Sequence, residues 1–132
     1  MDLTTTTTHW APRMLSILRI VSALLFLEHG TQKILGFPPG SSPPLASIYG
    51  VAGLLELIGG ALLIVGLFSR PVAFILSGQM AVAYFYSHAT KGFFPALNGG
   101  DAAILFCFVF LYIAFAGPGP WSIDAQRGRG RY

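Results

Sequence analysis

The sequence predicts an all-α integral membrane protein, a bundle of four helices, and three observations lead to this class. Of its 132 residues, 54% are hydrophobic and only 10% are charged, whereas soluble domains carry about 25% charged residues. The mean hydropathy of +0.66 also excludes a disordered chain. The apolar residues fall into four long runs. Because a backbone in lipid must satisfy its own hydrogen bonds, such continuous runs predict helices rather than barrel strands.

Each predicted element follows from the local sequence. Residues 1–12 are polar and rich in threonine, which predicts a flexible N-terminal tail. A helix needs about 20 residues to cross a bilayer, and four segments reach or approach that length: about 15–35, 45–68, 71–89 and 100–116. We expect them to form one domain over residues 13–117, followed by an interfacial basic tail over residues 118–132.

The breaks between these segments have chemical causes. Residues 36–44 contain four prolines, which lack the amide donor and restrict the residue before them, so this stretch predicts the longest ordered loop. Pro71 suits the first turn of the third helix. The aromatic residues of the stretch 92–95, and Trp121 after the fourth helix, are typical of the headgroup region of a membrane.

The positive charges predict the orientation of the bundle, because cytoplasmic loops are enriched in lysine and arginine. With the N-terminus inside, Lys33 and Lys91 fall on the outer face. The inner face then carries six arginines: Arg13, Arg19, Arg70, Arg127, Arg129 and Arg131. We therefore expect both termini in the cytoplasm. The basic tail suits anionic lipid headgroups, and three arginines beside a membrane domain give no reason to expect nucleic acid as a partner.

Glu56 is the most informative residue, because an ionisable group deep in a membrane costs about 2.5–3.5 kcal/mol on insertion scales. Gly53 and Gly60 share its helix face, and such small residues draw a helix close to its neighbours. Glu56 should therefore face a donor inside the bundle. The sequence leaves four donors open: His29, Lys33, Gln79 and His88. A structural pair that specifies helix register is the alternative to a role in ligand or proton handling.

The ionisable residues within or beside the apolar runs lie between the midplane and the outer surface, apart from the inner arginines. Eight polar residues are candidates for ligand binding or proton handling: Glu28, His29, Gln32, Lys33, Glu56, Gln79, His88 and Asp101. The stretch 28–33 also fits the wet end of a helix, and Asp101 fits an ordinary helix start. No spacing typical of a metal site is present. The single cysteine, Cys107, allows no disulfide or C-x-x-C pair within these residues.

Several motifs together resemble the DoxX family of small four-helix bacterial membrane proteins. They are the stretch Glu28-His29-Gly30-Thr31-Gln32-Lys33, the glycine-flanked glutamate in 53–60, the short basic turn 66–70, Gly100-Asp101 and the ending 117–124. The resemblance covers roughly residues 15–125 and implies a multi-pass protein of the bacterial inner membrane. Some DoxX-like proteins are assigned as subunits of a thiosulfate:quinone oxidoreductase, and others are described as membrane partners of redox-protective enzymes.

The leading hypothesis is an inner-membrane, redox-associated protein, a quinone-interacting subunit of an oxidoreductase with a polar pocket in the outer half of the bundle. We expect Glu56 and His29 to hydrogen-bond or exchange protons with the quinone carbonyls, with Lys33, Gln79 and His88 shaping the site. No intrinsic cofactor and no catalytic residue are assigned. Electrons would come from a partner, and other membrane or redox subunits or a second copy of the chain are expected beside the lipid.

Two other functions stay open. The first is a non-catalytic subunit or scaffold of a larger complex, in which the polar cluster only holds the bundle together. The second is a small proton-coupled transporter, since four-helix exporters of similar length also use a membrane glutamate. Such exporters often insert in both orientations, which needs balanced loop charges, and the excess of inner arginines ranks this alternative last.

Overall fold

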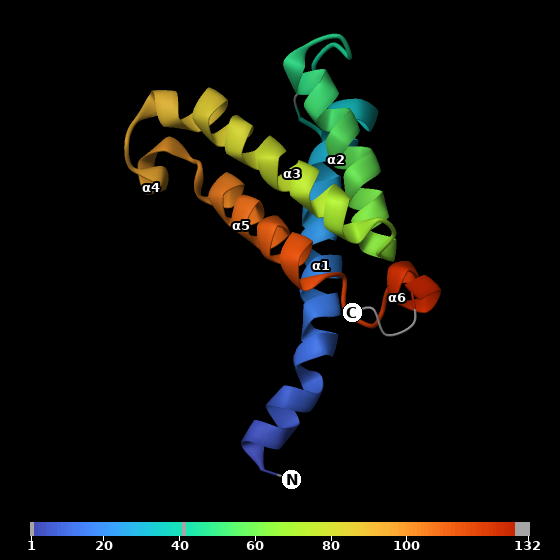
Figure 1. Ribbon diagram of the computed structural model, residues 1–132. Helices are drawn as coiled ribbons and strands as arrows, with labels where there is room; N and C mark the ends of the chain where they lie inside the picture. The colour runs from blue at the N-terminus through green and yellow to red at the C-terminus, as the bar shows by residue number, and fades with distance from the viewer. Residues whose placement is uncertain (1, 41, 129–132) are drawn as a thin grey trace.

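The computed structural model describes residues 2–40 and 42–128, and every regular element in these residues is helical. The four long helices alternate in direction (Figure 1): α1 (Leu3–Leu35), α2 (Ile48–Val65), α3 (Ser69–Ala83) and α5 (Asp101–Ala116). α3 continues through a π-helix, η1 (Tyr84–His88), into a 3₁₀ turn, η2 (Ala89–Lys91). Two short helices complete the described chain: α4 (Pro95–Asn98) and α6 (Ile123–Gly128).

The long helices pack as two pairs. α1 lies along α2, and α3 lies along α5, while α2 also contacts α3 and α1 also contacts α5. In Figure 1 the two pairs lie close together beside α6 and diverge toward α4. The molecule therefore has one end at which the pairs meet and one end at which they separate.

The hydrophobic core lies where the pairs meet. Its buried side chains are Ala23, Phe26, Leu63, Ala73, Leu76, Met80, Ala103, Phe110 and Ile113. The rings of Phe26 on α1 and Phe110 on α5 meet edge to face, with their centroids 5.0 Å apart, a geometry that aromatic pairs prefer. Other large apolar side chains, such as Phe74 and Phe108, are mostly exposed on the outer surface, as expected where lipid replaces water.

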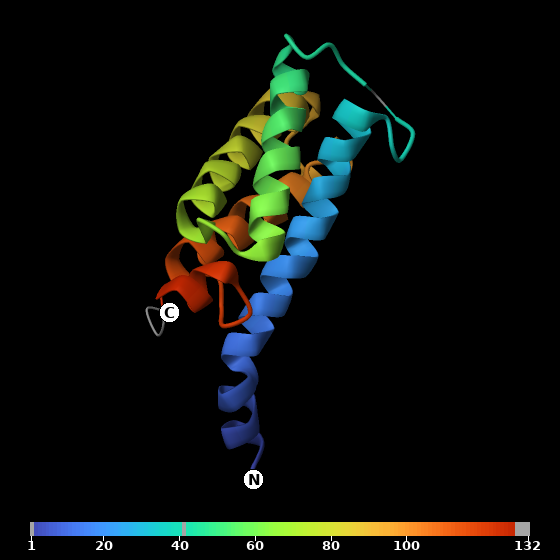
Figure 2. The ribbon, with the colours of Figure 1, turned by 90° about the vertical axis from the view of Figure 1, so that its right-hand side faces the viewer.

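The N-terminal part of α1 differs from the prediction. The helix begins at Leu3, where the sequence composition predicts a flexible tail, and Figure 2 shows this part extending beyond the other helices. The carboxylate of Asp2 caps the helix by accepting a 2.8 Å hydrogen bond from the Thr5 amide, which also lowers the pKa of Asp2. The hydroxyls of the next two threonines donate to carbonyls one turn earlier. Local capping therefore makes a helix of residues that their composition assigns to a tail.

The other long helices lie close to their predicted ranges. α2 is shorter than the predicted 45–68, because Ser47 caps its start and Gly66 ends it in a left-handed conformation with φ 71°. α3 and η1 together occupy the predicted 71–89, and α5 matches the predicted 100–116. Two of the described helices, α1 and α2, contain an apolar stretch long enough to cross a membrane, and α5 is a shorter apolar helix.

Candidate functional site

A cavity of about 630 Å³ opens between the two helix pairs, at the end where they diverge. Residues from α1, α2, α3, η1 and α5 line it, and most of them are apolar, including Phe26, Leu55 and Phe106. Small-molecule sites typically occupy about 300–1,000 Å³ and combine an apolar wall with a few polar groups. This cavity therefore has the size and the wall of a ligand site.

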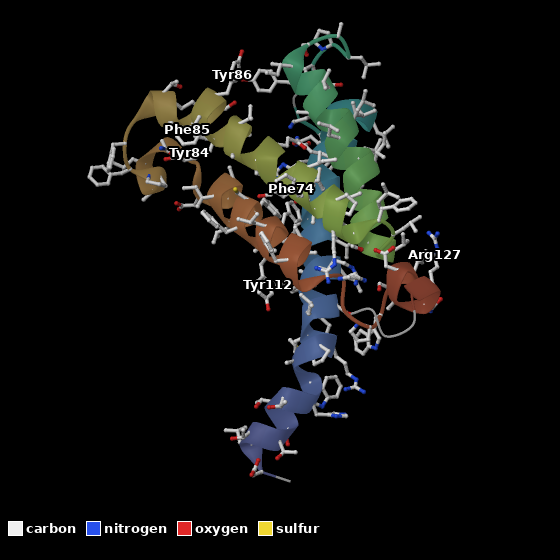
Figure 3. The ribbon with its side chains drawn as sticks, viewed as in Figure 1. Phe74, Tyr84, Phe85, Tyr86, Tyr112 and Arg127 are labelled. Atoms are coloured by element: carbon white, nitrogen blue, oxygen red, sulfur yellow. The ribbon has the colours of Figure 1, made fainter. Side chains whose placement is uncertain are left out.

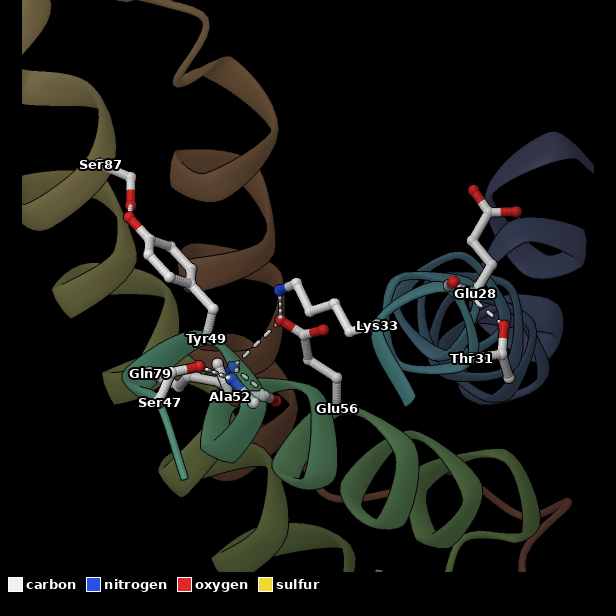
Figure 4. A network of polar contacts seen from close by, with 10 residues as sticks. Glu28, Thr31, Lys33, Ser47, Tyr49, Ala52, Glu56, Gln79 and Ser87 are labelled. Atoms are coloured by element: carbon white, nitrogen blue, oxygen red, sulfur yellow. Dashed lines mark hydrogen bonds and ion pairs between the residues drawn. The ribbon is translucent and has the colours of Figure 1, made fainter. Parts of the chain in front are cut away.

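Glu56 is the polar centre of the cavity wall and is only 2% exposed. Its Oε1 accepts a hydrogen bond of 2.8 Å from Lys33 Nζ and one of 3.2 Å from Gln79 Nε2 (Figure 4). Gln79 also donates to the carbonyl of Ala52, at 3.3 Å. Of the four donors that the sequence leaves open, the structure brings Lys33 and Gln79 to Glu56. Three helices, α1, α2 and α3, therefore converge on one carboxylate oxygen.

Glycines bring α1 and α2 close enough for this contact. A Cβ at Gly30 would lie 2.6 Å from the amide nitrogen of Leu57, and a Cβ at Gly53 would lie 2.9 Å from the Cβ of Lys33. Neither site accommodates a side chain without movement of the neighbouring helix, and close approach through small residues is typical of membrane helices. The two glycines thus place the stem of Lys33 against α2 and its ammonium group beside Glu56.

Two acceptor atoms of this cluster are buried and have no hydrogen-bond partner among the described residues: Glu56 Oε2 and Gln79 Oε1. Buried polar atoms are almost always paired in folded proteins, and an unpaired one destabilises the fold. An ion pair whose only role is to hold helices together is expected to satisfy its oxygens more fully. The incomplete pairing at Glu56 favours a role in binding over a purely structural one.

Two hydroxyl groups line the cavity between α2 and η1. The Tyr49 and Ser87 hydroxyl oxygens are 3.2 Å apart and join α2 to η1. Tyr86 of η1 also reaches toward α2 (Figure 3), where its ring centroid lies 6.0 Å from that of Tyr49. Sequence reasoning missed these residues as site components, since uncharged side chains near helix ends carry no signal that separates them from interface aromatics.

The two histidine candidates occupy different walls of the cavity. His29 lies on the α1 side, with an exposed side chain whose ring meets Phe106 edge to face at 6.4 Å. His88 lies on η1, where its Nδ1 is 3.2 Å from the carbonyl oxygen of Asn98. A π-helical turn is rare and frequently marks a functional site. In this molecule the turn carries Ser87 and His88, and both line the cavity.

The remaining three candidates lie away from the cavity. Glu28 is exposed, on the side of α1 that faces away from Glu56 (Figure 4). Gln32 donates from its Nε2 to the carbonyl of Pro39 at 3.1 Å, which ties the proline-rich loop to α1. Asp101 is exposed in the first turn of α5, where its charge suits the helix N-terminus. The candidates that line the cavity are His29, Lys33, Glu56, Gln79 and His88.

Arg19, one of the six arginines that the sequence assigns to the inner face, is buried rather than exposed to solvent. Its side chain is 0% exposed. The guanidinium donates to the carbonyls of Leu63 at 2.8 Å and Trp121 at 2.7 Å, and also to that of Pro118. A planar group with five donors suits converging carbonyls, and a count of charges cannot detect this. Arg129 and Arg131, also counted in that set, lie outside the described residues.

The segment 117–124 folds back onto the helices beside Arg19, and we call this segment together with Arg19 the C-terminal clasp. The carboxylate of Asp124 accepts hydrogen bonds from the amides of Phe68, at 2.9 Å, and Ser69, at 2.8 Å. It therefore caps the start of α3. The basic turn 66–70 and the ending of the described chain, which are far apart in sequence, bind each other at the end opposite the cavity.

The apolar outer surface, the two helices of membrane-spanning length and the buried ion pair define an all-helical membrane protein. The family model for DoxX matches residues 14–89, a range that contains all five candidates that line the cavity. The chain belongs to the DoxX family. The match covers more than half of its residues and includes Glu28 and Gln32, but not Asp101.

Two curated proteins are similar to this chain over most of its length. An uncharacterised protein of Haemophilus influenzae is 47% identical, over 87% of this chain and 91% of its own length. A protein of Escherichia coli named "Inner membrane protein YphA" is 28% identical, again over 87% of this chain and 91% of its own length. No solved structure matches this chain.

Proposed function

We propose that this protein binds a quinone-class ligand in the cavity beside Glu56, as a redox-associated subunit of the bacterial inner membrane. One observation carries the proposal: a single cavity combines an apolar wall with the Lys33–Glu56 ion pair. A quinone combines a flat apolar ring with two oxygen groups, so it needs both kinds of surface. A bound quinone supplies electron and proton acceptance, while the residues of this chain bind and orient it.

Lys33 is the residue that meets an oxygen of the ligand. Its ammonium group has three donors, and one of them goes to Glu56 Oε1. Its side chain lines the cavity and is 23% exposed, whereas that of Glu56 is 3% exposed. Glu56 is therefore a positioning residue that holds the ammonium group of Lys33 in place. This assignment differs from the sequence-based hypothesis, in which Glu56 itself contacts the quinone carbonyls.

The rim of the cavity is suited to the entry of an apolar ligand from the bilayer. Between α2 and α3 the rim consists of apolar side chains that are about half exposed: Val51, Ile75 and Val82. A lipid-soluble molecule can pass this rim without crossing water. An anion such as thiosulfate is less suited to the cavity. Among the described residues that line it, Lys33 is the only lysine or arginine.

The proposal includes an orientation in which the four long helices cross the membrane with both termini in the cytoplasm. Arg127 lies on α6 at the end of the molecule beside the C-terminal clasp (Figure 3), and Lys33 lies at the cavity end. This distribution supports a clasp in the cytoplasm and a cavity in the outer half of the bundle. A cysteine introduced at Gln126 in a Cys107→Ala background should react with an impermeant thiol reagent from the cytoplasmic side only.

Gly78 of α3 provides a direct test of the binding site. It lines the cavity, and a Cβ at this position would meet no atom within 4 Å. A Gly78→Phe substitution should therefore place a ring at the cavity wall with no clash at its Cβ, and phenylalanine is a better helix former than glycine. We expect saturable binding of duroquinone or its hydroquinone to the wild type in lipid nanodiscs, and binding about tenfold weaker in Gly78→Phe.

The matched control is Ala61→Phe, which places the same side chain on an exposed position of α2 outside the cavity. This variant should bind the ligand as the wild type does. Absence of saturable binding to the wild type, or equal binding by Gly78→Phe and the wild type, would overturn the proposed site.

A further inference from the structure

The tautomer of His88 is determined by the backbone. Its Nδ1 lies 3.2 Å from the carbonyl oxygen of Asn98. A carbonyl oxygen can only accept a hydrogen bond, so Nδ1 must carry the hydrogen. In the neutral ring Nε2 is then unprotonated and acts as an acceptor. His88 thus presents an acceptor on one edge of its ring and uses the other edge to hold its position.

The carbonyl that orients His88 is itself held firmly. The side chain of Asn98 is buried and donates to the carbonyl of Gly92 at 2.9 Å and to the hydroxyl of Tyr84 at 3.3 Å. Its amide oxygen accepts from the backbone amide of Gly100 at 2.8 Å. All the polar groups of this side chain are therefore engaged, which fixes the turn from η2 to α5 and the carbonyl that His88 contacts.

The remaining edge of the His88 ring is available to the cavity. One face of the ring stacks on Tyr84, with centroids 6.4 Å apart and planes inclined by 28°. Within residues 2–40 and 42–128, no hydrogen bond reaches Nε2. His88 nevertheless lines the cavity. The cavity therefore offers a donor, the ammonium group of Lys33 on α1, and an acceptor, Nε2 of His88 on η1.

We propose that the cavity selects the reduced, hydroxyl-bearing form of its ligand, a hydroquinone, through a hydrogen bond from a ligand hydroxyl to His88 Nε2. A hydroquinone hydroxyl both donates and accepts, so one hydroxyl accepts from Lys33 while the other donates to His88. A quinone has only acceptors, and its carbonyl oxygen would face Nε2 with no hydrogen between them. A site built to accept from a hydroxyl discriminates strongly against an analogue that lacks it.

This inference rests on the proposed function, because it names the redox form that the same cavity takes. His88 is then a specificity-determining residue rather than a catalytic one. The hydroxyls of Tyr49 and Ser87 also line the cavity and lie 3.2 Å apart, so the His88→Asn variant is needed to separate their contribution from that of His88.

The test compares three ligands that differ in the donor: durohydroquinone, duroquinone and the dimethyl ether of durohydroquinone. Binding is measured without oxygen, on the full chain in lipid nanodiscs. We expect durohydroquinone to bind about tenfold more tightly than either of the other two. Equal binding of all three would overturn the inference and leave the proposed function intact, whereas no binding of any of them would overturn both.

A His88→Asn variant tests whether the preference for durohydroquinone depends on Nε2 of His88. Asparagine keeps an amide donor near the position of Nδ1 and has no group at the position of Nε2. We expect the preference for durohydroquinone to disappear in this variant while duroquinone binding is unchanged. A preference retained in His88→Asn would overturn the inference. The control is His9→Asn, on an exposed part of α1 far from the cavity. If His88→Asn does not fold, the three-ligand comparison on the wild type decides the question.

Discussion

The two ends of this molecule treat a buried charge in opposite ways. At the C-terminal clasp, Arg19 is fully buried and donates to carbonyls from three separate residues. At the cavity, Glu56 is equally inaccessible, yet one of its oxygens has no partner among the described residues. A charge with every group engaged indicates a structural role, whereas a partly engaged charge beside open space indicates a site. By this criterion, the motif at the clasp is structural and the motif around Glu56 belongs to the candidate site.

The backbone is also closed at the clasp and open at the cavity. At the clasp, the carboxylate of Asp124 caps α3, and the segment 117–124 closes over the ends of the helices. At the cavity, α3 continues as the wider π-helix η1, and the helix pairs diverge. A closed end gives the bundle its stability, and an open end has room for a ligand. Substitutions at the two ends should therefore have different consequences.

The largest effect on stability is expected at the clasp. Replacing the guanidinium in Arg19→Met leaves the carbonyls of Leu63, Pro118 and Trp121 without their donor and should cost about 3–5 kcal/mol. Arg19→Lys keeps the charge but not the planar fork, so it should rescue only part of this loss. The measurement is thermal unfolding in detergent, with the surface variant Arg13→Met as the control. An unchanged Tm in Arg19→Met would show that the clasp is not structural.

The smallest effect is expected at the N-terminal end of α1, far from both the clasp and the cavity. The hydrogen bond from Thr5 holds the pKa of Asp2 below its usual value. The cap is therefore fully present above that usual value and is lost as the pH falls through the lowered pKa. Acidification should lower the protection factors of the Thr4–Thr8 amides, that is, their exchange rates corrected for the intrinsic effect of pH, without a change in ligand binding. Asp2→Asn should be insensitive to the same change of pH, and an equal response in both proteins would contradict this account of the cap.

Much of the fold follows from local signals in the sequence. Ser47 and Gly66 are typical cap residues and mark the ends of α2, and the apolar run of α5 is continuous. The helix over residues 3–12 could not be predicted from composition, because it depends on the local cap at Asp2. The π-helix also has no distinct local sequence signal, and its first residue, Tyr84, is contacted by Asn98 from beyond the next turn.

The candidate site was predictable in its residue types but not in its geometry. The depth of Glu56 and the small residues beside it indicate that it faces the bundle. Its choice of Lys33 and Gln79 depends on how α1 and α3 are rotated about their axes, which no local pattern specifies. The burial of Arg19 was not predictable for a related reason: its partners are backbone carbonyls, which every residue carries and which therefore leave no signal in the sequence.

The most direct test of the central claim is a paired measurement on Glu56→Gln, of unfolding and of durohydroquinone binding. Glutamine keeps an acceptor for Lys33 and Gln79 but removes the charge that faces the Lys33 ammonium group. Because the Lys33 side chain is 23% exposed, we expect a loss of stability smaller than that of Arg19→Met. Affinity should fall about tenfold, because the ammonium group of Lys33 loses the charge that positions it. The contradicting result is a loss of stability as large as that of Arg19→Met, with wild-type affinity in the protein that remains folded. Glu56 would then be a structural residue like Arg19.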